Sequence, residues 1–339
     1  MAQTEKRFDA VFEGGGVKGI GLVGAYSVLE AQGYTPVNLA GTSAGAIVAA
    51  LIAAGYRADE LRNILMELDF EQFLDEPLLG SVPLAGKVID EIVHLGLYKG
   101  ERFLRWMRDL LAAKGKRTFG QLLSTSETDP RYRFLLRVVA ADLSRHKLLI
   151  LPDDAKDYGI EPESLEIAEA VRMSMSIPFF FCPVVRKTRP QDETCYIVDG
   201  GVLSKFPVDL FDTPGMPPWP TFGFHLAAGR DGATSSYHPI QGLGSMLRAI
   251  VETMMDAHDA RYLEDHAFVR TIAIETLGIS TINFGLRKDQ KQALFDAGAA
   301  AARDFLEHWD FQKYKELFRA ERPLPRRRET VWRGQKRNS

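Results

Sequence analysis

The residues best placed to do chemistry surround Ser43, in the sequence Gly41-Thr42-Ser43-Ala44-Gly45. This G-x-S-x-G pattern is typical of a nucleophile elbow, a sharp turn between a strand and a helix that presents a serine hydroxyl. Glycines flank the serine because side chains there would clash in the strained turn. Apolar residues at 37–40 and a small, apolar run at 44–54 suit the strand and the helix. The alternative is an ordinary glycine-rich turn in which Ser43 caps the helix.

A second motif, Glu13-Gly14-Gly15-Gly16-Val17-Lys18-Gly19, lies between a strand-like run at 9–12 and a helix-like run at 20–32. Its glycines leave backbone N–H groups uncovered, so the loop suits the oxyanion of an acyl-transfer reaction. Lys18 adds positive charge nearby, or its side chain points to solvent. The spacing of Gly14, Gly16 and Gly19 also fits G-x-G-x-x-G, so a nucleotide-binding module is the competing interpretation. That fingerprint needs an acidic residue about 20 positions further on, where this chain has Gly41-Thr42-Ser43.

A serine nucleophile needs a neighbouring base. Asp199 ends an apolar run and is followed by Gly200-Gly201, which would hold its carboxylate at the edge of a sheet. An ordinary Asp-Gly turn is the alternative interpretation. Of the seven histidines, His225 is the best candidate because it ends a strand-like run.

Together these segments resemble the patatin-like phospholipases over about residues 8–208, in the type, order and separation of three motifs. The resemblance implies a Ser-Asp dyad in which Ser43 is the nucleophile and Asp199 accepts its proton. It also implies an oxyanion hole built from the glycine loop, at Gly14, Gly15, Gly16 and Val17. One departure is Glu13, where many members of the family carry Asp.

The activity implied is that of a phospholipase A or lysophospholipase, which releases fatty acids without a histidine, a metal or a cofactor. Neutral-lipid esters or acyl thioesters are the alternative substrates for the same dyad. An unperturbed aspartate has a pKa of about 4 and is a weak base at neutral pH. Partial burial would raise the pKa of Asp199, and the glycine loop would have to supply much of the transition-state stabilisation.

The chain has 339 residues, 45% hydrophobic and 26% charged, with a formal net charge of -3. This is an ordinary globular composition, and the charge gives no general attraction to nucleic acid. No secretory signal and no apolar stretch long enough to span a bilayer is visible. We expect a cytoplasmic protein whose substrate is a phospholipid or another acyl lipid. We also expect it to contact the membrane surface transiently. Cys182 and Cys195 are expected to be reduced thiols.

Strand-like and helical runs alternate, which predicts an α/β fold: a three-layer α/β/α sandwich with a mainly parallel central sheet. Strands are expected at 9–13, 37–40, 134–140, 148–151, 179–185, 196–198, 221–226 and 269–275. Helices are expected at 20–32, 44–54, 58–68, 102–113, 165–173, 243–263 and 289–308. The apolar stretch 70–100, which glycine and proline interrupt, would be a lid over the site or an ordinary insertion. The three phenylalanines at 179–181 would line an acyl pocket or simply belong to a buried strand.

We expect residues 1–310 to form a patatin-like catalytic domain and residues 311–339 to form a flexible basic tail. From Arg319 to Ser339 there are eight basic and two acidic residues. Such a tail is either a solvated extension or a segment that adheres to anionic lipid. Potential metal ligands between 256 and 266 are scattered around their helix, so no metal site is expected.

Overall fold

The computed structural model describes residues 6–74, 96–124, 132–212, 215–227, 269–281 and 283–318, with the isolated positions 240, 242, 246, 249 and 253. An eight-stranded sheet runs through this part of the chain in the order β5-β6-β3-β2-β1-β7-β8, with β4 paired to β3. The strand bounds are β1 (Lys6–Phe12), β2 (Tyr34–Thr42), β3 (Leu136–Asp142), β4 (Lys147–Leu151), β5 (Val184–Lys187), β6 (Thr194–Asp199), β7 (Thr221–Ala227) and β8 (Thr271–Glu275).

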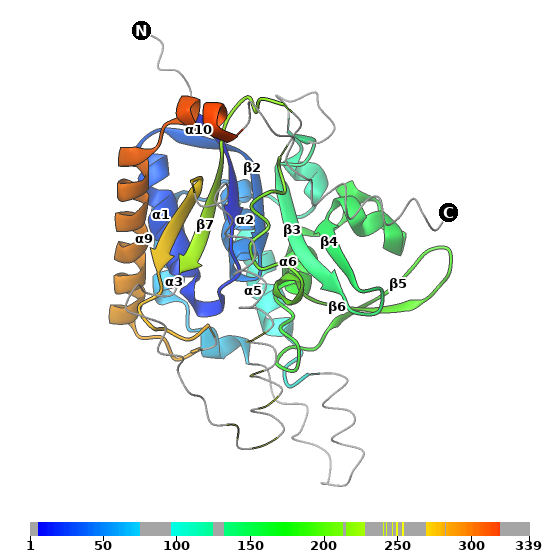
Figure 1. The fold of residues 1–339 in the computed structure, drawn as a ribbon. Helices are drawn as coiled ribbons and strands as arrows, with labels where there is room; N and C mark the ends of the chain where they lie inside the picture. Colours follow the sequence, from blue (N-terminus) through cyan, green and yellow to red (C-terminus); the bar gives the residue numbers. More distant parts are fainter. Residues whose placement is uncertain are drawn as a thin grey trace.

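Helices flank this sheet (Figure 1). The α-helices are α1 (Gly19–Ala31), α2 (Ala44–Ala54), α3 (Ala58–Glu67), α5 (Glu101–Ala113), α6 (Ile167–Ser174), α9 (Lys288–His308) and α10 (Phe311–Phe318). The short 3-10 helices are η1 (Gly16–Lys18), η2 (Phe70–Phe73), η4 (Phe119–Leu122), η6 (Asp153–Tyr158), η7 (Pro162–Ser164) and η8 (Gly200–Val202). Within the described residues, no helix combines the length and apolar character needed to cross a membrane.

The centre of the sheet is parallel and one side of it is antiparallel. Strand β1 pairs in parallel with β2 and β7, β2 with β3, and β7 with β8. The pairs β3–β4, β3–β6 and β5–β6 are antiparallel. This confirms the predicted α/β class with a mainly parallel central sheet. Because parallel strands end at the same edge, the turns that follow β1 and β2 lie side by side.

The side chains of β1 alternate between two faces of the sheet. Phe8, Ala10 and Phe12 belong to the main core, to which α1, α2, α3, α5, α6 and α9 all contribute. Val11 faces the other side and packs with the segment containing Phe206. In the described residues that segment is not helical. The helix expected at 243–263 lies almost wholly outside the described residues.

Strand β3 brings the ends of β2 and β6 together. Its residues Val138 to Asp142 pair with β4 along one edge, so the other edge is shared by β2 and β6. On that edge Val139 pairs with Thr42, and the next residue, Ala140, pairs with Asp199. Since β2 is parallel to β3 and β6 is antiparallel, their carboxyl ends meet at this point. The two strands therefore converge where Ser43 and Asp199 stand.

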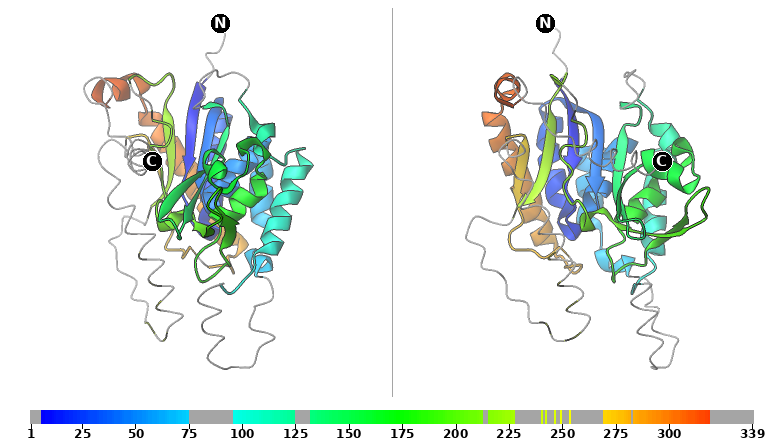
Figure 2. Two further views of the ribbon diagram at one scale, coloured as in Figure 1. Left: turned by 90° about the vertical axis from the view of Figure 1, so that its right-hand side faces the viewer. Right: turned by 45° about the vertical axis from the view of Figure 1, so that its right-hand side comes forward.

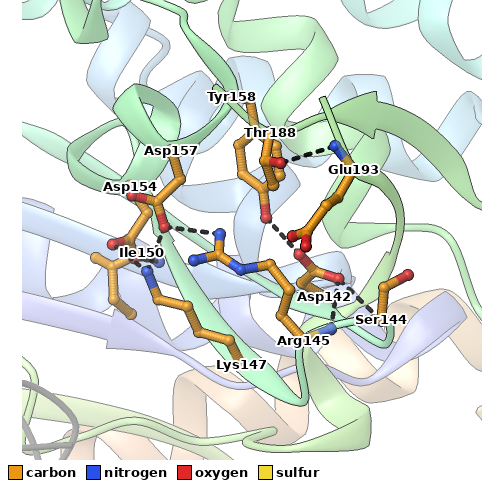
Figure 3. A network of polar contacts seen from close by, with 10 residues as sticks. All are labelled: Asp142, Ser144, Arg145, Lys147, Ile150, Asp154, Asp157, Tyr158, Thr188 and Glu193. Carbon is orange, nitrogen blue, oxygen red and sulfur yellow. Dashed lines mark hydrogen bonds and ion pairs between the residues drawn. The ribbon is translucent and has the colours of Figure 1, made fainter. Parts of the chain in front are cut away.

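A network of polar contacts fixes the hairpin between β3 and β4 (Figure 3). The Asp142 carboxylate accepts hydrogen bonds from the backbone N–H of Ser144 and from the Tyr158 hydroxyl, at 2.9 and 2.7 Å. Lys147 and Arg145 both pair with Asp157, at 2.8 and 3.0 Å. These contacts hold η6 against β4, and so they stabilise the β3 register on which the site depends.

Several expectations are corrected or fall outside the described part. The strand expected at 179–185 is wrong in its first half, because Phe179 has a φ of 66° and the chain turns before β5 begins at Val184. Cys182 and Cys195 are free thiols. Residues 75–95, most of the expected lid or insertion, lie outside the described residues. The potential metal ligands at 256–266 do so as well, and the described residues contain no metal-like group of His, Cys, Asp or Glu.

The segment assigned to the tail begins with a helix. α10 packs its Tyr314 ring against Trp309, with 5.5 Å between the ring centroids, and Tyr314 is buried. The helix lies at the end of the sheet where β1 begins, away from the carboxyl ends of the strands (Figures 1 and 2). Residues 319–339 lie outside the described residues. A domain boundary near residue 310 therefore stays a prediction.

Candidate active site

Ser43 stands between β2 and α2 in a strained backbone conformation. Its φ is 52° and its ψ is -124°, a region that costs a residue with a side chain about 1–3 kcal/mol. A Cβ on Gly41 would lie 2.2 Å from the Gly45 carbonyl oxygen, and one on Gly45 would lie 2.3 Å from the Phe12 carbonyl oxygen. Only glycine therefore fits at both positions of the motif. The sharp turn brings Gly41 against Gly45, and the start of α2 lies against the end of β1 at Phe12, so neither position has room for a side chain.

The Ser43 side chain does not cap the helix that it precedes. Its hydroxyl instead donates to the Met175 sulfur, with 3.6 Å between Oγ and Sδ. Thioether sulfur is a weak acceptor, so this contact is easily exchanged for a better one. Ser43 is 1% exposed. The hydroxyl is thus buried at the start of α2, in weak contact with a thioether.

Asp199 ends β6 at the same point and is fully buried. Its Oδ1 accepts the N–H of Gly201 at 2.8 Å, and its own N–H donates to the Ser176 carbonyl at 2.9 Å. Its other oxygen, Oδ2, has no hydrogen-bond partner among the described residues. A Cβ on Gly200 would lie 2.5 Å from the Val139 carbonyl oxygen, which explains the first glycine after the aspartate.

Burial raises the pKa of Asp199 from 3.8 to about 6, although the Gly201 N–H and the Ser43 hydroxyl act in the opposite direction. Desolvation is the dominant cause because the charged carboxylate loses its hydration. The influence of the Ser43 hydroxyl on this carboxyl group reflects their proximity. An aspartate with a pKa near 6 is a much better base at neutral pH than an exposed one.

The glycine loop lies beside Ser43, since a Cβ on Gly14 would be 3.2 Å from the serine Cβ. The N–H groups of Gly14 and Val17 already donate to the carbonyls of Lys205 and Thr281, at 3.0 and 3.1 Å. The N–H groups of Gly15 and Gly16 have no acceptor in the described part of the chain. Two of the four predicted oxyanion-hole positions therefore have a donor to spare, and the other two help to anchor the loop.

A buried cluster of charges supports the loop from its first residue. Glu13 is fully buried and pairs with Lys205 Nζ at 2.8 Å and with His225 Nδ1 at 2.7 Å. The Leu226 N–H donates to the same carboxylate. Burial alone would raise the pKa of Glu13, but the neighbouring Lys205 and His225 lower it to about 2. Glu13 therefore stays ionised and fixes the start of the loop.

The structure brings Ser43, Asp199 and the glycine loop together, and it places other candidates elsewhere. His225 contacts Glu13, so the best histidine candidate supports the loop rather than the serine. Lys18 is buried and does not point to solvent. Sequence reasoning missed the roles of Met175 and Lys205. Their contacts join segments far apart in the chain, so they depend on the tertiary structure.

Comparisons with known proteins relate this chain to a family and to a fold. The chain matches the family model described as patatin-like phospholipase over residues 10–212. It is 40% identical over 306 residues to the uncharacterized protein YqhO of Bacillus subtilis (strain 168), covering 89% of this chain and 99% of that protein. It is 24% identical over 202 residues to the "Probable lipid hydrolase 463L" of invertebrate iridescent virus 6, covering 59% of this chain and 61% of that protein.

The fold also resembles that of solved protein structures. VipD from Legionella pneumophila superposes with a TM-score of 0.52 at 17% sequence identity, over 90% of this chain and 67% of that one. At this identity the likeness concerns the fold alone.

Proposed function

Because the chain belongs to the patatin-like phospholipase family, we propose that it is a serine acyl hydrolase of the phospholipase A or lysophospholipase type. The observation that carries the proposal is the strained Ser43 at the meeting point of β2 and β6, beside the buried Asp199. Asp199 Oδ2, which has no hydrogen-bond partner in the described part of the chain, is the atom available to accept a proton. Similarity to a viral protein named as a probable lipid hydrolase supports a lipid ester as the substrate.

In the proposed reaction the Ser43 hydroxyl exchanges its weak contact with Met175 for one with Asp199. Its oxygen then forms a bond to the ester carbonyl carbon while Asp199 takes the proton. The backbone N–H groups of Gly15 and Gly16 donate to the developing oxyanion, a contribution of about 3–4 kcal/mol for each such donor. The alcohol leaves with the proton from Asp199, and an acyl-serine remains.

Water completes the cycle. Asp199 removes a proton from water as the water oxygen bonds to the acyl carbon, and it then returns that proton to the leaving Ser43 oxygen, which restores the hydroxyl and releases the fatty acid. No metal or cofactor is needed for any of these steps. The raised pKa of Asp199, about 6, makes it competent for both proton transfers near neutral pH.

The test is fatty-acid release from mixed phospholipid vesicles by the parent chain, Ser43→Ala and Asp199→Asn. General-base catalysis contributes about 10²–10⁴-fold, so Asp199→Asn should lose activity by that factor. Ser43→Ala should release nothing. Asp192→Asn is the matched control because its carboxyl group lies on the exposed hairpin between β5 and β6. In the parent chain kcat/KM should rise with pH through about 6 and then level off, because the base must be deprotonated.

Other outcomes point to the alternatives. Activity only on a triacylglycerol emulsion or on acyl-CoA would keep the dyad and change the substrate class. Undiminished release by Ser43→Ala would exclude Ser43 as the nucleophile. Binding of a nucleotide, without covalent labelling of Ser43 by a serine-reactive phosphonate, would favour a binding module built on the glycine loop instead.

A further inference from the structure

The residues just after the last turn of α6 contact both members of the proposed dyad. The Met175 sulfur accepts the Ser43 hydroxyl, and the Ser176 carbonyl accepts the Asp199 N–H. Ser174, the last residue of α6, makes a third contact, in which its Oγ accepts the backbone N–H of Ser43 at 2.8 Å. Three consecutive residues therefore contact the two residues on which catalysis would depend.

The Ser174 hydroxyl also donates to the Val139 carbonyl, with 2.5 Å between the oxygens. Thr42, the last residue of β2, pairs with Val139, and the chain turns away from the sheet at Ser43. The hydroxyl lies where the ladder of backbone hydrogen bonds would have continued. It joins Ser43 to β3 through a side chain, since the strained turn moves the two backbones apart.

The end of α6 is itself held firmly. The buried Arg172 guanidinium donates to the Ser176 Oγ and to the carbonyls of Lys99 and Cys182, at 2.5, 2.5 and 3.0 Å. Ser174 is fully buried. A side chain with this anchoring can impose a geometry on its neighbour rather than follow it.

We propose that Ser174 is a positioning residue for the nucleophile. Its hydroxyl holds the Ser43 backbone at positive φ and so directs the serine Oγ toward Asp199 and the glycine loop. This inference rests on the proposed acyl-hydrolase function, but it concerns a residue that touches no reacting atom. Without the hydroxyl, the Ser43 N–H and the Val139 carbonyl lose a shared partner in a buried place, and the turn relaxes.

The first test compares Ser174→Ala and Ser174→Cys with the parent chain on a soluble p-nitrophenyl ester. A displacement of about 1 Å at a reacting atom costs about 100-fold in rate, so Ser174→Ala should lower kcat by about 10- to 100-fold. KM should stay within about twofold, because ground-state binding is unchanged. The cysteine fills the space but is a weak donor and acceptor, so Ser174→Cys should remain impaired.

Ser27→Ala is the matched control, since it also removes a serine hydroxyl that donates to a backbone carbonyl, that of Gly24 at 2.7 Å. It should leave kcat unchanged. Full activity in Ser174→Cys would mean that the side-chain volume matters and the hydroxyl does not, which would overturn the proposal. An unchanged kcat in Ser174→Ala would show that Ser174 does not position the nucleophile.

A second readout does not depend on activity. Hydrogen exchange of the Ser43 amide, followed on a peptide spanning the turn, should be slow in the parent and in Ser27→Ala and faster in Ser174→Ala. Equal protection in all three proteins would overturn the proposal. If the parent hydrolyses no ester, the proposed function fails, while the exchange rates still decide whether Ser174 holds the turn.

Discussion

Asp199 should make the folded protein less stable above about pH 6, and its replacement by asparagine should remove that cost. Burial raises the pKa of Asp199 from 3.8 to about 6. The folded state therefore holds the proton more tightly than the unfolded state does. Below about pH 4 both states are protonated and the group costs nothing. As pH rises toward about 6 the parent loses stability, and above that pH the loss is complete.

The magnitude follows from the size of the shift. Each pKa unit corresponds to about 1.4 kcal/mol, and the pKa moves from 3.8 to about 6. The free energy of unfolding of Asp199→Asn, relative to the parent, should therefore increase by about 2–3 kcal/mol between about pH 4 and pH 8. Asparagine is neutral throughout this range, and its side-chain oxygen can still accept the Gly201 N–H.

The assay is urea unfolding of the parent and Asp199→Asn at several pH values, with activity measured on the same samples. Comparing the two proteins at each pH cancels the titration of all other groups. Asp192→Asn should show no such gain, because interactions with Lys187 lower the pKa of that exposed carboxyl group instead. If the difference between Asp199→Asn and the parent does not change with pH, the carboxyl group is not desolvated and the argument for its basicity fails.

Three further predictions concern the glycine loop and Glu13, which precedes its glycines. Gly16→Ala should abolish ester hydrolysis and also lower the melting temperature, because Gly16 has a φ of 54° and its Cβ would lie 2.0 Å from the Thr281 carbonyl oxygen. Gly15→Ala would meet only the end of a flexible side chain, so it should lower kcat at a nearly normal melting temperature; full activity in a folded Gly15→Ala would exclude this loop as the oxyanion hole. Glu13→Gln removes the buried carboxylate that pairs with Lys205 and His225, and should destabilise the fold by about 3–5 kcal/mol at neutral pH. A urea midpoint equal to that of the parent would show that the pair contributes nothing.

Much of the fold could be read from local pattern. The helix α2 has the bounds expected from its run of small and apolar residues, 44–54. Most strands begin and end within a few residues of their apolar runs, because the period of two is a property of consecutive residues. The same dependence on local pattern explains why the strand predicted at 179–185 was wrong in its first half. Its three phenylalanines look like a strand, yet the positive φ of Phe179 makes a turn, and Phe180 stacks on Phe284 at 4.9 Å between ring centroids.

The candidate site divides in the same way. Glycines 41, 45 and 200 are identifiable from sequence because a strained turn or a close approach between backbones excludes a side chain wherever it occurs. Sequence alone is therefore enough to propose Ser43 as a nucleophile and Asp199 as its base. Their proximity was not visible, since it depends on β3 pairing with Thr42 and with Asp199 at adjacent residues.

The sequence by itself determined the chemistry available to this chain: a serine in a G-x-S-x-G turn, a carboxylate before two glycines, and a loop with three consecutive glycines. Tertiary structure decided the rest. Segments far apart in the chain bury Asp199 and so raise its pKa. They also bring Lys205 and His225 into contact with Glu13. Local residue types set which groups can react, whereas desolvation and contact distance arise only when the sheet assembles around them.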